Sequence, residues 1–232
     1  MQRRTVLHRW AIAAIVLTAP LFVYGEDAKP DRFESTIRKF EASDAKDPPK
    51  PNGVLFTGSS SVRMWNLGES FPKLGAINRG FGGSTLPEVL HYFDRVVVPY
   101  RPRTIAIYCG DNDINKGRTP EQVFADFVVF VDRVRRQIGE DVSVVYIAIK
   151  PSRARWKLWP KMARANALIA AWASTTRGVD YADIATPMLT NVEAGSPPPA
   201  DLFVEDGLHL SAKGYTMWTR VLAPLVGDSE SR

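Results

Sequence analysis

The stretch that decides the fold is V-L-F-T-G-S-S-S-V-R-M-W, residues 54–65. Four strand-forming residues lead into Gly58 and three consecutive serines, and the start of a helix follows. A serine between a strand and a helix is ordinarily a helix cap, so this stretch alone favours a cap over a nucleophile. The remainder of the chain decides between the two interpretations.

Short apolar runs alternate with longer amphipathic ones along the rest of the chain. Strands are predicted at 54–57, 104–108, 142–149 and 179–181, and helices at 31–42, 86–100, 120–139, 161–175 and 211–226. The helix after Thr119 opens with a capping box and Pro120, and Gly139 ends it. This alternation predicts the α/β class, a parallel sheet between helix layers, in which ligands bind at the carboxyl ends of the strands.

The length of 232 residues, with 45% hydrophobic residues, suits one domain. Arg3, Arg4 and Arg9 precede or open an apolar stretch at 10–23, which predicts a signal peptide over 1–25 and therefore export to the periplasm or the cell exterior. The stretch is shorter than the roughly 20 residues of a membrane span, although an uncleaved anchor is the alternative. We expect a lead-in helix and linker at 26–52, the α/β domain at 53–227 and a tail at 228–232.

Charge and cysteine content narrow the choice of partners. The predicted signal segment holds three of the 30 basic residues and none of the 25 acidic ones, so the remaining chain is nearly neutral. It has no long Lys/Arg tract, so no nucleic-acid partner is expected. Cys109 is the one cysteine, which excludes an intramolecular disulfide, and no His/Cys cluster has metal-ligand spacing. We expect neither a metal nor an organic cofactor, and nothing in the sequence indicates the oligomeric state.

Four loops contain residues that acyl transfer requires. They are Gly58–Ser61, Asn78–Thr85 after Ala76-Ile77, Cys109–Asp113 after 104–108, and Asp206–His209 before the last helix. Each alone is typical of an ordinary cap or turn. Ester hydrolysis needs a serine, an imidazole base, a carboxylate that holds the imidazole, and donors for the oxyanion. The four loops together supply all of these groups.

The choice of base falls on His209. Once a signal peptide is removed, His91 and His209 are the two histidines left. His91 lies in the predicted helix at 86–100 and is interpreted as a scaffold residue. His209 has Asp206 three residues earlier in a loop, close enough for the carboxylate to reach the imidazole.

The four loops resemble, in order, the four blocks of the SGNH or GDSL-type hydrolases. G-S-S-S is similar to the first block, N-R-G-F-G-G-S-T to the second, G-D-N-D to the third and D-G-L-H to the last, over residues 54–210. The resemblance implies the flavodoxin-like three-layer sandwich of that family, with a parallel sheet flanked by helices. It also implies a serine esterase that forms an acyl-enzyme.

The resemblance also assigns the site residues. It implies that Ser60 is the nucleophile, that His209 is the base and that Asp206 orients the imidazole. The implied oxyanion donors are the backbone N–H groups of Ser60 and Gly83 and the side-chain amide of Asn112. Ser59 stands where the family usually has aspartate, which leaves the details of the turn open. Ser61 is interpreted as a residue of the first helical turn that helps to fix the helix.

The substrate is open at this stage. We expect short acyl esters such as acetyl esters, with esters on carbohydrates as one class, because aromatic and basic side chains suit a sugar-binding rim. The candidates for such a rim are Trp65, Arg153, Arg155, Trp156 and Trp159, and packing in the core or a loop is the equal alternative for the tryptophans.

Three alternatives remain. The same triad could transfer the acyl group to a sugar hydroxyl, or the chain could bind a glycan with an inactive site. Asp111, Asp113 and Asn115 match the first, third and fifth positions of a calcium loop. Such a loop needs glycine and glutamate where this chain has Lys116 and Gln122, which argues against calcium.

Overall fold

The computed structural model describes residues 30–227, so the predicted signal peptide and tail lie outside the described residues. Within this range a parallel sheet has the order β2-β1-β3-β4-β5. Its strands are β1 (Val54–Gly58), β2 (Ile77–Gly80), β3 (Thr104–Tyr108), β4 (Ser143–Ile147) and β5 (Val179–Ala182).

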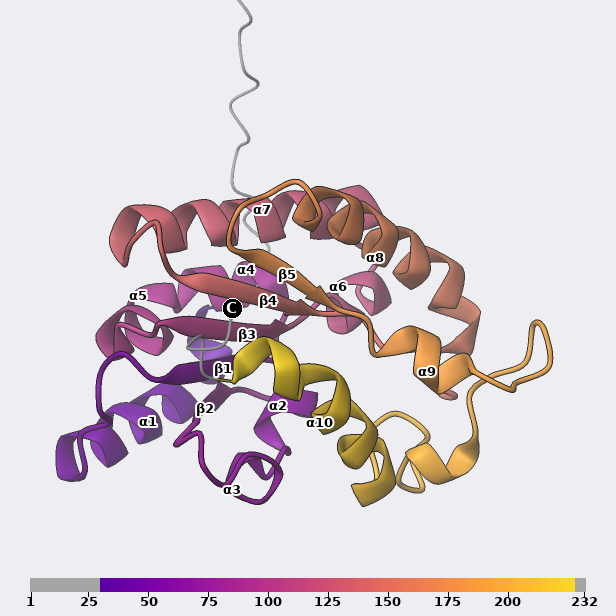
Figure 1. Cartoon of the computed structure of the whole chain (residues 1–232), viewed down its shortest axis with the longest axis horizontal. Helices are drawn as coiled ribbons and strands as arrows, with labels where there is room; N and C mark the ends of the chain where they lie inside the picture. Colours follow the sequence, from indigo (N-terminus) through magenta and orange to yellow (C-terminus); the bar gives the residue numbers. More distant parts are fainter. Residues whose placement is uncertain (1–29, 228–232) are drawn as a thin grey trace, which may run out of the picture.

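Helices cover both faces of the sheet (Figure 1). They are α1 (Glu34–Lys46), α2 (Ser60–Arg63), α3 (Leu67–Ser70), α4 (Leu86–His91), α5 (Phe93–Val96), α6 (Asp111–Asn115), α7 (Pro120–Gln137), α8 (Trp159–Ala173), α9 (Ala185–Leu189) and α10 (Ala212–Val226). Short 3-10 turns are η1 (Pro30–Phe33), η2 (Val98–Tyr100), η3 (Trp156–Leu158) and η4 (Ala200–Leu202).

The core has two halves, because successive strand residues point to opposite faces. Leu55, Ile105 and Val144 pack with α1, α4, α5, α7 and α8 in one half. Phe56 and Ala106 pack with α2, α3, α9 and α10 in the other. The predicted three-layer α/β sandwich is therefore confirmed, with interior strands β1 and β3 buried along their whole length.

The predictions for β2 and for the helix at 86–100 were wrong. Asn78 and Arg79 belong to the edge strand β2 and not to a loop. Their polar side chains hid the strand, since the Asn78 amide bonds the Val62 and Trp65 carbonyls and Arg79 pairs with Asp44. The predicted helix at 86–100 is broken into α4, α5 and η2. The break after α5 follows from β-branched valines that lead into Pro99.

The predicted lead-in helix is displaced and packs on the domain. The sequence predicted 31–42, whereas α1 runs from Glu34 to Lys46 after η1. Ile37 is fully buried, and the Phe33 ring meets the edge of Phe81 with centroids 4.9 Å apart. The segment therefore borders the loop that follows β2, which is one of the four candidate loops.

Candidate active site

The turn after β1 depends on glycine. Gly58 has φ +119°, and a Cβ there would collide with the Tyr108 carbonyl of β3. Ser59 donates its N–H to that carbonyl (3.0 Å) and is the N-cap residue of α2, although its hydroxyl makes no cap bond. Ser60 is therefore the first residue of α2, at the carboxyl end of an interior strand.

The structure brings the predicted triad together. Ser60 Oγ lies 3.0 Å from His209 Nε2, and His209 Nδ1 lies 2.6 Å from Asp206 Oδ2. The carboxylate accepts a hydrogen bond from the Nδ1–H group, so the proton stays on Nδ1 and Nε2 is free to accept from the serine hydroxyl. This is the arrangement that a general base requires, and His91 takes no part in it because it lies exposed at the end of α4.

Asp206 remains ionised under ordinary conditions. Partial desolvation raises the pKa of its carboxyl group, but hydrogen bonds from the His209 ring and from the backbone N–H groups of His209 and Leu208 outweigh this, and the pKa falls to about 2. A charged carboxylate is what stabilises an imidazolium when His209 takes up a proton.

The loop that carries Asp206 and His209 is fixed at both ends. Phe203 and Leu210 form an antiparallel bridge, and the Val204 N–H donates to the His209 carbonyl (2.9 Å). Ser211 then caps α10 by accepting from the Gly214 N–H. The position of His209 is therefore set by α10 and by the chain before it.

Gly83, a predicted oxyanion donor, lies in the turn after β2. It has φ +81°, which favours glycine, and its carbonyl accepts from Arg32 (2.7 Å). Gly80 holds this turn close to α2, because a Cβ there would press on Val62 and Arg63. Within residues 30–227, the N–H groups of Ser60 and Gly83 have no acceptor.

Asn112, the third predicted donor, is on α6. Its Nδ2 donates to the Ser84 carbonyl (3.0 Å), next to Gly83, and its Oδ1 accepts from Arg155 (3.1 Å). The buried Asp113 carboxyl accepts from the Leu86 and Gly110 N–H groups and thereby joins α6 to α4. Burial raises the pKa of Asp113 to about 7 despite these bonds.

A buried ionic cluster behind the triad was missed from the sequence. Lys150 has 1% of its surface exposed, and its Nζ bonds Asp111 Oδ2 (2.9 Å), Tyr108 OH (3.0 Å) and Ser61 Oγ (3.2 Å). Three donors meet three acceptors, so the ammonium group is satisfied. The available signal was a lysine three residues after the end of the buried β4, a position at the sheet edge that carries the site.

Of the two alternatives for Trp65, rim or core, the structure shows the core. This side chain is 3% exposed and packs in the core against Phe56, Phe71, Tyr215 and Trp218. Trp156 and Trp159 are half-buried and stack on each other, with centroids 6.2 Å apart. Arg153 donates to the Pro198 carbonyl.

The calcium alternative also fails on geometry. Asp111 bonds Lys150 and Arg155, and Asp113 is occupied by backbone N–H groups. Across the part of the chain that the structure describes, no group of three His, Cys, Asp or Glu side chains could hold a metal ion. Between residues 30 and 227 no helix combines the length and apolar composition of a membrane span.

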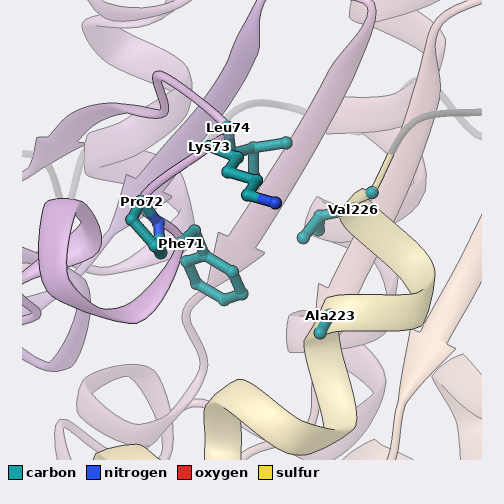
Figure 2. Close-up of a pocket in the computed structure, with 7 residues that line it drawn as sticks. Phe71, Pro72, Lys73, Leu74, Ala223 and Val226 are labelled. Atoms are coloured by element: carbon teal, nitrogen blue, oxygen red, sulfur yellow. The ribbon is translucent and has the colours of Figure 1, made fainter.

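A cavity of about 270 Å³ lies away from the triad (Figure 2). Its walls are the loop before β2, including Phe71 and Leu74, and the end of α10, including Ala223 and Val226. Because α10 starts beside His209 and runs back along the sheet, this cavity is at the amino ends of the strands. It is separate from the candidate site.

A parallel sheet between two helix layers, with a hydrogen-bonded Ser-His-Asp set at its strand ends, is typical of a serine hydrolase. The model of the GDSL-like lipase/acylhydrolase family matches residues 56–217, and the chain belongs to this family. It is therefore a carboxylic ester hydrolase. No curated protein sequence matches the chain significantly.

The solved structures that share the fold include the following three. A Streptococcus pneumoniae protein, provisionally described as a platelet activating factor, is 23% identical with TM-score 0.73, covering 84% of this chain and 92% of its own. A GDSL-like lipase from Bacteroides thetaiotaomicron is 19% identical with TM-score 0.70, covering 83% and 97%. A catalytic mutant of an acetylxylan esterase from Geobacillus stearothermophilus is 14% identical with TM-score 0.61, covering 79% and 97%.

Proposed function

We propose that the protein hydrolyses short-chain acyl esters, with acetyl esters on carbohydrates as its substrates, through an acyl-enzyme on Ser60. The observation that carries the proposal is the continuous hydrogen-bonded chain from Ser60 through His209 to Asp206. A hydroxyl within 3.0 Å of an imidazole held by a carboxylate is the arrangement that activates a serine at neutral pH.

The mechanism has two steps. Ser60 Oγ attacks the ester carbonyl while its proton moves to His209 Nε2. The backbone N–H groups of Ser60 and Gly83 and the side-chain amide of Asn112 bind the oxyanion. His209 then gives the proton to the leaving alcohol as the C–O bond breaks. Water, deprotonated by His209, attacks the acyl-enzyme and releases the acid, which restores the Ser60 hydroxyl.

Three observations support a carbohydrate ester. The triad is open to solvent, with 23% of the His209 side chain and 47% of the Asp206 side chain exposed, so a bulky polymer can approach it. The paired Trp156 and Trp159 offer aromatic surface after β4. A related fold is found in an acetylxylan esterase. The proposal also includes export, because acetylated glycans are substrates outside the cytoplasm.

The test is Ser60→Ala, assayed with p-nitrophenyl acetate and acetylated xylan. We expect hydrolysis to fall by at least about 10⁴-fold, since loss of a triad serine leaves only binding and oxyanion stabilisation. Ser59→Ala is the matched control, because its hydroxyl makes no cap bond, and should keep most of the activity. A folded Ser60→Ala protein with wild-type rates would contradict the proposal. Product analysis with an added polyol separates hydrolysis from acyl transfer.

A further inference from the structure

The segment after β4 belongs to none of the four sequence blocks, yet it brings two cations to the site. It reads K-P-S-R-A-R-W from Lys150 to Trp156. Lys150 and Arg155 both pair with the buried Asp111, the residue before Asn112. A guanidinium and an ammonium thus converge on the loop that presents a predicted oxyanion donor.

We propose that Arg155 is a positioning residue that holds the Asn112 amide with Nδ2 directed to the oxyanion. Arg155 Nη1 donates to Asn112 Oδ1 (3.1 Å) and to the Asp111 carboxylate. The inference rests on the proposed function, because it concerns how the same reaction's oxyanion is stabilised.

The amide needs such a guide because its two orientations have nearly the same shape. With the oxygen toward the substrate, Asn112 would repel the negative charge that develops there. Arg155 can only donate, so it selects Oδ1, while the Ser84 carbonyl can only accept, so it selects Nδ2 (3.0 Å). The two contacts fix one orientation and leave the second Nδ2 hydrogen for the oxyanion.

The charge on Arg155 contributes beyond orientation. A charged donor on Oδ1 polarises the amide and makes the Nδ2 hydrogens stronger donors. A preorganised dipole at the oxyanion acts more strongly in the transition state than in the ground state, so its effect falls on kcat. Removing Arg155 should therefore slow the reaction while KM changes little.

Arg155 is itself held by the buried cluster. Asp111 is 3% exposed and accepts from Lys150, from Tyr108 OH and from Arg155. Burial raises the pKa of Asp111, but the nearby charges of Lys150 and Arg155 outweigh this and keep the pKa below its ordinary value. The carboxylate therefore stays charged and anchors the guanidinium.

The backbone before this segment is equally fixed. Asn166 on α8 accepts from the Ile149 N–H (2.8 Å) and donates to the Ile149 carbonyl (2.9 Å), so both polar groups next to Lys150 are bound. Lys150 also bonds Ser61, the neighbour of Ser60. One cluster thus ties the loop of the proposed nucleophile to the loop of Asn112.

This geometry separates Arg155 from the predicted sugar-binding rim. Its Nη1 is bound to two protein acceptors, and only 16% of the side chain is exposed. A rim residue would offer its donors to the substrate and would change KM when removed. The two roles therefore differ in a measurable parameter.

The experiment is a double-mutant cycle of Arg155→Met and Asn112→Ala, with kcat and KM measured on p-nitrophenyl acetate. We expect Asn112→Ala to lower kcat by about 100- to 1,000-fold and Arg155→Met by about 10- to 100-fold, with KM within about twofold. In the Asn112→Ala background, Arg155→Met should lower kcat by less than a further factor of about two, because Arg155 acts on the amide that this background lacks. Inhibition by ethylboronic acid, whose adduct with Ser60 is tetrahedral, should weaken in parallel with kcat.

Two further variants keep the result decisive. Arg155→Lys retains a cation that can pair with Asp111, but the lysine Nζ lies one bond closer to the backbone than Nη1 and cannot keep both contacts at their present length. A folded protein with lowered kcat is therefore expected even if Arg155→Met fails to fold. Arg133→Met removes a partly buried arginine of α7, bonded to the Leu90 carbonyl and paired with Asp94, and should leave kcat within about twofold.

The outcomes distinguish the inference from the proposed function. If Ser60→Ala keeps its activity, the proposed function fails first. If Ser60→Ala is inactive but Arg155→Met lowers kcat by the same factor with and without Asn112, the positioning role is wrong. It is also wrong if Arg155→Met changes KM instead of kcat. A fully active, folded Arg155→Lys would also overturn it.

Discussion

Two acidic side chains serve the candidate site from opposite environments. Asp206 is about half exposed and bonds the His209 ring, whereas Asp111 is fully buried between Lys150 and Arg155. An exposed ion pair adds little to stability, while a buried one costs several kcal/mol when a single partner is removed. Changes in the Asp206 loop therefore affect the chemistry with little effect on the fold, whereas changes in the Asp111 cluster affect both.

The largest expected effect comes from removing the exposed carboxylate of Asp206. Asp206→Asn should lower kcat by about 10³- to 10⁴-fold, because an amide no longer stabilises the imidazolium and favours the wrong tautomer. The free energy of unfolding should change by less than about 1 kcal/mol, since the carboxylate is about half exposed. Ester hydrolysis and urea unfolding measure the two quantities.

The matched control is Asp201→Asn, in the same region and paired with Lys213 at the surface. It should change neither kcat nor the free energy of unfolding appreciably. An Asp206→Asn variant that unfolds as easily as it loses activity would remove the distinction between the two environments.

The next effect comes from the buried cluster of Lys150 and Asp111. Lys150→Met should lower the free energy of unfolding by about 3–5 kcal/mol, because Asp111, Tyr108 and Ser61 lose a shared donor in the interior. Lys213→Met, which breaks an exposed pair, should cost less than about 1 kcal/mol. Equal losses in urea unfolding would mean that burial does not set the energy of the Lys150 cluster.

The same contrast explains how far the sequence could predict this molecule. Buried strands such as β1 and β3 were predicted because they are continuous apolar runs between turn residues. The edge strand β2 was missed because Asn78 and Arg79 bond α2 and α1 through polar side chains. Local patterns do not record contacts with distant segments.

The candidate site shows the same limit. Ser60, Asp206 and His209 lie in short blocks whose order and spacing resemble a family, so they could be proposed from sequence. The partnership of Lys150 with Asp111 joins positions 39 residues apart, and a lysine placed after a buried strand does not by itself show which residue it pairs with. Trp65 was left between a rim and the core for the same reason, since nothing in its local sequence distinguishes core from surface.

The smallest expected effect is a pH dependence that separates Asp206 from the buried Asp113. The folded-state pKa of Asp206 is about 2, below its ordinary value of 3.8, so its stabilising contribution is complete above about pH 4 and is lost as pH falls toward 2. Asp113 has the opposite sign: its folded-state pKa of about 7 makes stability fall as pH rises from about 4 to 7. The difference in unfolding free energy between wild type and Asp206→Asn should therefore grow between pH 2 and 4 and stay constant between pH 4 and 7. It should remain below about 1 kcal/mol, because the carboxylate is about half exposed. Urea titrations across both windows measure it, and a difference that changes mainly above pH 4 would show that Asp206 is not held in its charged form by His209.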